Sequence, residues 1–453
     1  MKAYKFIFLI VLMTGTMFIT SAQKMVFPEK QWLKYENAAD AGFSKNGLDS
    51  LYQQLNQGSA AFVVEINGKI VVDWGETSRR FILTSARKSL MSAMIGIYVG
   101  KGKINPNSTL AELGIDDIQP LTEIEKQARV IDLMAARSGI YLPSAYAPQG
   151  MINNLPTRGS AKPGEQWFYN NWDFNTLSTI FNQQSGKDFF EAFQDEIAKP
   201  LQMEDFRLFD TFYRYEQDKS KHPAYLFRLS ARDLARFGHL YLNEGKWKGK
   251  QIIPKDWVAK STSAYTKDTD RFQNFGSYGL LWWTMEIDGV KTFYASGAGG
   301  QRVYIIPELD MVIAHLSNNY QESRLGEEEV NDLVKLLLKA KVGKQNKKAK
   351  LAKQTAPIKA IPAVKLDMQL AAQIQGTYQH PRVGIMKIKL QNEKLILEAG
   401  IGNFHLLPTS NDTFFVEDIE MTATFKPGSA EQKSKIENVF NSKRQIEKLI
   451  FYY

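Results

Sequence analysis

The chain has 453 residues, of which 44% are hydrophobic and 12% aromatic, so it can bury a large core and we expect two domains rather than one. It contains no cysteine, which excludes disulfide bonds, a thiol nucleophile and a lipid-bearing cysteine. The net charge of +9 equals the nine lysines of residues 339–365, a stretch without Asp or Glu. The rest of the chain is therefore close to balanced, which argues against a nucleic-acid partner.

The N-terminus has the pattern of a secretory signal peptide. Lys2 and Lys5 precede an apolar run over residues 6–19, and small residues follow up to Ala22. A membrane anchor is the alternative, but the run is shorter than the roughly 20 residues that a spanning helix needs. We therefore expect residues 1–22 to be removed and the mature protein to be secreted or periplasmic.

The front of the mature chain predicts a helix and a hairpin. Ser44 can cap a helix that runs to about Gln53. Two apolar runs, 61–66 and 69–74, flank Asn67-Gly68, which is the strongest short-range hairpin signal in the chain.

The remainder of the first domain predicts helices followed by strands. Residues 122–260 are mainly helical in pattern, and short apolar runs separated by turn residues come after them. The clearest helices are 174–182, 230–243 and 254–260, the strands are 278–285, 290–294, 301–306 and 311–316, and a closing helix covers 331–339. Strands at both ends imply one sheet of an α/β domain with a helical insertion above it, and a cleft can form between the two.

A second, smaller domain follows a Lys-rich stretch. We interpret residues 341–365 as a solvated linker that could contact anionic envelope polymers. Residues 366–453 alternate apolar and polar side chains in short runs, which predicts a small antiparallel β-barrel or meander. Such a domain could cover the cleft, bind a ligand or simply stabilise the chain.

Ser85 and Lys88 stand at the head of a helix that is otherwise apolar on most faces and ends near Gly100. Three residues apart on a helix, the two side chains lie side by side, one turn from the N-terminus. A desolvated lysine amine has a lowered pKa and can accept the serine proton, while the helix N-terminus favours the resulting anion. We therefore predict that Ser85 is a nucleophile and Lys88 its base.

Tyr169 and Asn171 end an aromatic loop and form a second candidate motif. A tyrosine hydroxyl near the Lys88 ammonium would have a lowered pKa and could act as a general base or proton shuttle. Asn171 could orient the substrate and the lysine. A packed aromatic side chain is the alternative for Tyr169.

The segment Ser296-Gly297-Ala298 lies between two strand-like runs. Its small residues would let a substrate approach the backbone, and the N–H of Ala298 could form an oxyanion hole with the N–H of Ser85. A flexible turn is the alternative.

Each motif is weak alone, because S-x-x-K recurs at Ser21 and Y-x-N recurs at Tyr35 and Tyr241. Their order and spacing carry more information. Over residues 48–340 the chain resembles the penicillin-recognising serine hydrolases, especially the class C β-lactamase-like branch with its esterases, D-amino-acid peptidases and amide hydrolases. The matching segments are Ser85-Ala86-Arg87-Lys88, Tyr169-Asn170-Asn171, residues 229–257 and Ala295-Ser296-Gly297.

The resemblance implies a serine β-lactamase-like fold for residues 28–340, with an antiparallel sheet flanked by helices and a helical insertion. It also implies a lipocalin-like barrel for residues 366–453. The implied activity is hydrolysis of an ester or amide in a small molecule or peptide, through an acyl-enzyme on Ser85. Lys88 and Tyr169 would transfer protons, and neither a metal nor a cofactor is needed.

One residue departs from the family pattern. Ala295 stands where the resemblance places a basic or imidazole residue that helps to bind a substrate carboxylate. Arg302, Arg228 or Lys221 could supply that charge instead. Ala295 leaves open a non-catalytic sensor or binding protein of the same fold, and the lysines of residues 339–365 leave open a basic surface-binding protein.

Overall fold

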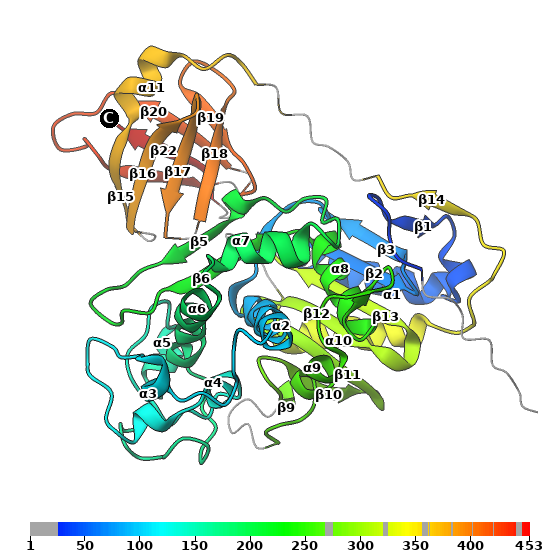
Figure 1. Cartoon of the computed structure of the whole chain (residues 1–453). Helices are drawn as coiled ribbons and strands as arrows, with labels where there is room; N and C mark the ends of the chain where they lie inside the picture. Colours follow the sequence, from blue (N-terminus) through cyan, green and yellow to red (C-terminus); the bar gives the residue numbers. More distant parts are fainter. Residues whose placement is uncertain are drawn as a thin grey trace, which may run out of the picture.

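The computed structural model describes residues 26–267, 275–319, 325–355, 361, 363–381, 384–400, 402–419, 421–440 and 446–453. The signal peptide predicted for residues 1–22 lies outside the described residues. The described chain forms a larger first domain and a smaller second domain that lies against one side of it (Figure 1). Among the described helices, none combines the length and the apolar character needed to cross a membrane.

A nine-stranded sheet forms the centre of the first domain, and both ends of the domain contribute to it as the sequence predicted. The hairpin of β2 (Ala61–Ile66) and β3 (Lys69–Gly75) turns at Asn67 and Gly68, whose φ values of 49° and 76° suit a tight hairpin turn. β13 pairs antiparallel with β2, which joins the late strands to the early hairpin. In spatial order the strands are β14 (Leu351–Lys353), β1 (Leu33–Tyr35), β3, β2, β13 (Met311–Leu316), β12 (Gln301–Ile306), β11 (Val290–Gly297), β10 (Trp283–Ile287) and β9 (Ser277–Tyr278).

Two of the late strands differ from their predicted bounds, whereas β12 and β13 match them. β11 continues past the predicted end at residue 294 to Gly297, so Ser296 and Gly297 belong to a strand and Ala298 begins the turn that follows. The predicted strand 278–285 is divided into β9 and β10, because Leu281 adopts a φ of 66° that an extended strand cannot contain.

Helices cover the sheet, and the most buried of them leads away from the candidate nucleophile. All residues of α2 (Arg87–Gly100) from Arg87 to Tyr98 are buried, which explains its apolar character on every face. It contacts α6 (Asn171–Ser185) and α9 (Lys255–Ser261), while α8 (Ala231–Leu242) packs on the sheet and α1 (Lys45–Leu55) packs against α10 (Glu327–Ala340). Shorter helices are α3 (Leu110–Leu113), α4 (Val130–Met134), α5 (Gln149–Ile152), α7 (Phe189–Phe193) and α11 (Met368–Ile374).

A small sheet that was not predicted pairs two strands of the region expected to be mainly helical with a strand that precedes Ser85. Its three strands are β4 (Phe81–Ile82), β6 (Ala224–Leu229) and β5 (Thr211–Arg214). β6 is buried at every position and therefore shows no alternation of apolar and polar residues. β4 immediately precedes the Ser85 segment, so this small sheet positions the chain where it leads into the candidate site. A further two-stranded ribbon consists of β7 (Lys246–Trp247) and β8 (Lys250–Gln251).

The Lys-rich stretch 341–365 is not entirely the solvated linker that its composition predicted. Residues 351–353 form β14, which pairs antiparallel with β1 at the edge of the nine-stranded sheet. Gln354 follows and is buried, with its side-chain amide donating to Asp73 Oδ1 over 2.8 Å. The first domain therefore extends further along the chain than its predicted end at residue 340.

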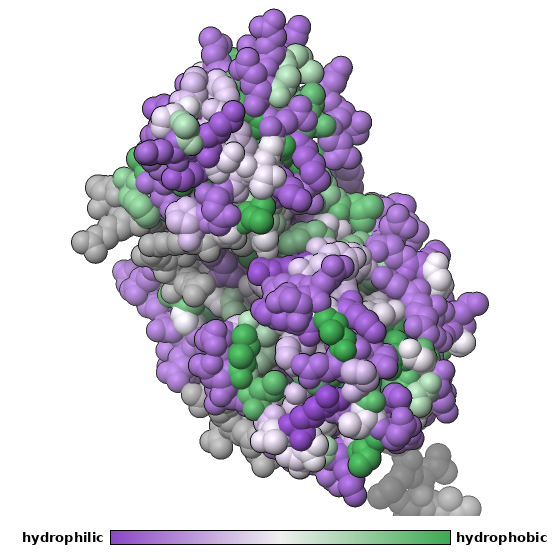
Figure 2. All heavy atoms as spheres, turned by 90° about the vertical axis from the view of Figure 1, so that its left-hand side faces the viewer, coloured by the Kyte–Doolittle hydropathy of each residue, from purple (hydrophilic) through white to green (hydrophobic). Residues whose placement is uncertain are grey.

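The second domain is a nearly closed β-barrel, as predicted. Its strands follow the order β15 (Gly376–His380), β16 (Gly384–Gln391), β17 (Lys394–Ala399), β18 (Gly402–Pro408), β19 (Thr413–Val416), β20 (Met421–Lys426), β22 (Ile446–Tyr452) and β21 (Ile436–Phe440). A bridge between Gln379 and Lys435 brings the two edges of this sheet together. Buried aromatic rings fill the interior, where Phe425 stacks on Phe451 at 4.8 Å. In Figure 2 the barrel forms the upper lobe, and its visible surface is predominantly hydrophilic.

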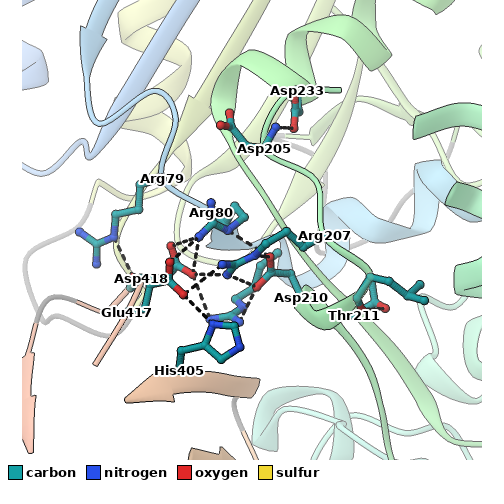
Figure 3. A network of polar contacts seen from close by, with 12 residues as sticks. Arg79, Arg80, Asp205, Arg207, Asp210, Thr211, Asp233, His405, Glu417 and Asp418 are labelled. Atoms are coloured by element: carbon teal, nitrogen blue, oxygen red, sulfur yellow. Dashed lines mark hydrogen bonds and ion pairs between the residues drawn. The ribbon is translucent and has the colours of Figure 1, made fainter. Parts of the chain in front are cut away.

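Charged side chains join the two domains, and we call them the interdomain cluster (Figure 3). Its members are Arg80, Arg207, Asp210 and Arg228 of the first domain and Glu417 and Asp418 of the barrel. Arg80 Nη2 lies 2.9 Å from Asp418 Oδ1, and Arg207 Nη1 lies 3.0 Å from Glu417 Oε2. Asp210 and Arg228 form an ion pair of 2.5 Å and are fully buried. We expect these charge pairs to favour one orientation of the barrel on the first domain.

The two barrel carboxylates of the cluster differ, because burial raises the pKa of Asp418 whereas the contacts of Glu417 lower its pKa. Burial opposes its ionisation, but the hydrogen bond with His405 and the charge of Arg207 outweigh burial and lower the pKa of Glu417 to about 2. The cluster also lies close in sequence to the candidate site, because Arg80 directly precedes β4 and Ser85 follows β4.

Candidate active site

Ser85 and Lys88 are brought together at the start of α2. Ser85 lies in a single 3-10 turn (η2, Thr84–Ala86) after β4, and α2 begins only at Arg87, so the pair spans two elements and not one helix as predicted. A hydrogen bond of 2.7 Å joins Lys88 Nζ and Ser85 Oγ. This contact is the geometry that a base needs to remove the serine proton.

The surroundings of Lys88 favour the neutral amine. Its side chain is only 2% exposed, and its Nζ lies 4.8 Å from the ring centre of Tyr169 and 4.7 Å from that of Phe174. Burial, with a smaller contribution from the neighbouring charge of Arg87, lowers the pKa of Lys88 well below its usual value. An amine without a proton is a base, so the environment prepares Lys88 to accept the proton of Ser85.

Tyr169 also contacts Ser85, but its ionisation differs from the prediction. Its hydroxyl forms a hydrogen bond with the Ser85 side chain. Burial raises the pKa of Tyr169 to about 12 and outweighs the hydrogen bond with Ser85 and the charges of Arg87 and Arg302, which lower it. The predicted lowering assumed a charged lysine nearby, whereas burial favours a neutral Lys88. Tyr169 therefore holds its proton and suits the role of a proton donor or relay.

Asn171 does not orient Lys88 in the structure. Its Nδ2 donates to the main-chain carbonyl of Tyr146 over 2.7 Å, and its buried Oδ1 has no hydrogen-bond partner among the described residues. Tyr146 has a φ of 58°, a conformation rare for a large side chain, and its N–H donates to Glu216 Oε1. Asn171 thus fixes a strained residue in the wall of the site.

The third motif packs directly against the nucleophile turn. A Cβ atom on Gly297 would lie 2.2 Å from the carbonyl oxygen of Leu83 and 2.9 Å from the N of Ala86. Only glycine allows this approach, because both neighbours are main-chain atoms. The Ala298 carbonyl accepts a hydrogen bond of 3.1 Å from Thr84 Oγ1. The predicted oxyanion donors, the N–H groups of Ser85 and Ala298, therefore lie on two segments that meet here.

We expect the Gly297→Ala substitution to lower the free energy of unfolding by about 1–3 kcal/mol, because β11 or the turn must move to make room for the methyl group. Urea unfolding followed by tryptophan fluorescence measures this loss. Gly343→Ala is the matched control, since a Cβ there meets no atom closer than 3.7 Å. Equal stability of the two variants would contradict the close approach.

Thr84 and Arg87 also belong to the site, although neither was predicted. Thr84 has a φ of 47°, which for a β-branched residue costs on the order of 1–3 kcal/mol. The carbonyl of Thr84 accepts a hydrogen bond of 2.8 Å from Arg87 Nη1, and its hydroxyl is bound to Ala298. Both contacts hold the strained turn that presents Ser85. The sequence did offer one signal for Arg87, since it is a charged residue at the head of an otherwise apolar segment.

Three residues were predicted as possible sources of the positive charge that Ala295 lacks. Of these, Arg302 contacts the third motif. It pairs in register with Ser296, and its Nη1 donates to the Gly297 carbonyl over 3.0 Å. Its charge is engaged by Glu327 at the start of α10. Of the other two, Arg228 belongs to the interdomain cluster, and the Lys221 main chain is bound to Asp117.

A cavity of about 820 Å³ opens at Ser85. Five of the seven predicted site residues line it, while Lys88 and Gly297 are not among its lining residues. The predicted residues that line the cavity are Ser85, Tyr169, Asn171, Ser296 and Ala298. The charged residues of its wall are Arg214, Glu216, Lys219 and Glu327. A volume of this size accommodates a drug-sized or short peptide substrate. Within the described ranges, no three His, Asp or Glu side chains are grouped to hold a metal ion.

Comparison with known proteins identifies the family. The family model described as Beta-lactamase matches residues 48–336, which is more than half of the chain. The chain belongs to the beta-lactamase family. Among the relatives of this beta-lactamase-family protein is the 6-aminohexanoate-dimer hydrolase of Paenarthrobacter ureafaciens. The two are 24% identical over 311 residues, covering 60% of this chain and 76% of the relative.

Solved structures confirm the β-lactamase-like fold. A candidate 6-aminohexanoate-dimer hydrolase from Bacillus anthracis is 22% identical, with a TM-score of 0.51, and the match covers 69% of this chain and 87% of that one. SurE, crystallised with D-Leu, is 17% identical with a TM-score of 0.50, and its match covers 84% of this chain and 91% of its own. The beta-lactamase-family protein described here thus has the fold that its three motifs predicted.

Proposed function

We propose that this beta-lactamase-family serine hydrolase is exported and cleaves an ester or amide bond through an acyl-enzyme on Ser85. The observation that carries the proposal is the hydrogen bond of 2.7 Å between Ser85 and a buried lysine whose pKa is lowered well below its usual value. The name of the Paenarthrobacter relative, an amide hydrolase, supports an amide or a related ester as the bond that is cleaved.

The first half of the proposed reaction transfers the acyl group to the enzyme. Lys88 takes the proton of Ser85 while Oγ forms a bond to the substrate carbonyl carbon. The N–H groups of Ser85 and Ala298 bind the oxyanion. When the tetrahedral intermediate collapses, the bond to the leaving oxygen or nitrogen breaks. Tyr169 gives its proton to the leaving group and receives the proton held by Lys88, which suits a tyrosine whose pKa is about 12.

The second half returns the enzyme to its starting state. Water attacks the acyl carbon, and its proton passes through Tyr169 to Lys88. The Ser85 ester bond then breaks, Oγ takes the proton back from Lys88, and a carboxylic acid leaves. The sum of both halves is one water consumed and one acid and one alcohol or amine released.

A fluorophosphonate probe tests the nucleophile directly. We expect the wild-type protein to gain one probe mass per chain, with peptide mapping to Ser85, and the Ser85→Ala variant to gain none. Ser263→Ala is the matched control, because Ser263 is exposed and lies outside the cavity wall. Labelling of the control but not of Ser85→Ala supports the proposal. A wild-type protein that neither reacts with the probe nor turns over acyl esters would instead be the non-catalytic sensor of the same fold.

A further inference from the structure

One part of the cavity wall carries more positive than negative charge. Arg214 and Lys219 both line the cavity, and both are paired with the same carboxylate. Arg214 Nε lies 2.9 Å from Glu216 Oε1, and Lys219 Nζ lies 2.6 Å from Glu216 Oε2. Two cations share one anion, so this part of the wall has a net charge of about +1.

The other charged groups at the wall do not cancel this excess. Glu327 lines the cavity but is paired with Arg302. Arg87 lies behind the wall, with its guanidinium 5.5 Å from the ring centre of Tyr146 and its Nε and Nη2 without hydrogen-bond partners among the described residues. A buried, unpaired cation adds positive potential to the cavity in front of it.

Arg214 is held in place by contacts from both domains. Its guanidinium lies 5.2 Å from the Tyr146 ring centre, and its Nη1 donates to the main-chain carbonyl of Gly400 over 3.1 Å. Gly400 belongs to the connection between β17 and β18 of the barrel. The side chain is still 35% exposed, so a ligand can reach it. A guanidinium fixed in this way binds a carboxylate with little further loss of side-chain entropy.

The rest of the wall is suited to an apolar body attached to that carboxylate. Met151, Phe275 and Trp283 line the same cavity. An apolar molecule with one anionic end would bury its body against these side chains and place its charge beside Arg214 and Lys219.

We propose that Arg214, assisted by Lys219, is a specificity residue. It binds a carboxylate of the substrate that is separate from the ester or amide carbonyl attacked by Ser85. It would supply the positive charge that Ala295 lacks, from a different strand and with support from the barrel. The inference rests on the proposed function, because it takes the cavity at Ser85 to be the substrate pocket. The substrate class is therefore an anionic amide or ester with an apolar chain.

Binding to the non-reacting Ser85→Ala protein tests this inference without any chemistry. The probes are adipic acid monoanilide, which has a free carboxylate, and hexananilide, which is its neutral match. We expect the acid to bind about 10- to 100-fold more tightly, and the difference to shrink with added salt. Adding Arg214→Gln should remove the preference, Arg214→Lys should restore part of it, and Glu216→Gln should increase it because a competing carboxylate is gone.

The matched control is Arg129→Gln, since Arg129 is also ion-paired and lies outside the cavity wall. It should leave the preference unchanged. Equal binding of both anilides, or a preference that survives Arg214→Gln, would overturn the inference. The proposed function would not be affected by this result, because it is tested separately by the labelling of Ser85 in the wild type. Failure of the labelling with a preserved acid preference would overturn the function and leave Arg214 as an anion-binding residue.

Discussion

Replacing Lys88 with methionine is expected to reduce kcat/KM by at least about 10³-fold while raising the unfolding temperature of the protein. The loss of activity follows from the loss of the amine that is hydrogen-bonded to Ser85 Oγ and accepts its proton. The gain in stability follows from replacing a buried ionisable group with an apolar side chain of similar length.

The sign of the stability effect depends on pH. Burial lowers the pKa of Lys88 well below 10.5 in the folded state, so between that lowered pKa and about pH 10.5 the unfolded chain binds a proton that the folded protein does not. Lys88 therefore costs stability at neutral pH, and this cost falls towards zero as the pH rises through 10.5. We expect the gain from Lys88→Met to be larger at pH 7 than at pH 10.

Thermal unfolding of wild type and variant at both pH values measures the effect. Lys101→Met is the matched control, since Lys101 caps the other end of the same helix and its side chain is 45% exposed. A Lys88→Met variant that is less stable than wild type at pH 7 would show that the lysine is charged in the folded protein. The wild-type activity gives a parallel test, because kcat/KM should fall at acidic pH as Lys88 becomes protonated.

The Asp210→Asn substitution is expected to lower the free energy of unfolding by about 3–5 kcal/mol. Asp210 is fully buried and accepts ion pairs from Arg80, Arg207 and Arg228, at distances of 3.0, 2.7 and 2.5 Å. Asparagine has nearly the same shape but no charge, so three guanidinium groups would share only the carboxylates of the barrel. Removing one partner from a buried charge network leaves the others uncompensated.

Urea unfolding followed by tryptophan fluorescence measures this loss. Asp195→Asn is the matched control, because Asp195 pairs with Lys199 on the surface and its side chain is 47% exposed. Surface pairs contribute about 0–1 kcal/mol, so the control should unfold almost as the wild type does. A cost below about 1 kcal/mol for Asp210→Asn would mean that water reaches the interdomain cluster.

Much of the sheet could be predicted because its strands carry local signals. The hairpin at Asn67-Gly68 and the strands 301–306 and 311–316 are apolar runs bounded by turn residues, and they fold as predicted. β4 and β5 were missed because they are short, and β6 was missed because the charged Arg228 interrupts its apolar run. β14 was missed for a different reason, since a polar edge strand depends on its partner β1 and not on its own composition.

The residues of the site also fall into two groups, those that local motifs predict and those that depend on the folded structure. Ser85, Lys88 and Tyr169 stand in recognisable motifs, and the structure brings all three into contact. The ionisation of Tyr169 was predicted with the wrong sign because burial, which raises its pKa, is not visible in a sequence. Arg214 could not be found at all, since its position in the wall results from β5 pairing with β6 and from a carbonyl of the second domain.

The composition of the interdomain cluster has a consequence for how this protein can be divided. The first domain contributes three arginines and one aspartate to it, and the barrel contributes the other two carboxylates. The carboxylates of the barrel thus neutralise arginines on the facing surface of the first domain. A chain shortened to the first domain would carry that face bare and would also lose the carbonyl that steadies Arg214. The charge balance of each domain therefore depends on the other, and a different barrel joined to this first domain would need carboxylates at the positions of Glu417 and Asp418.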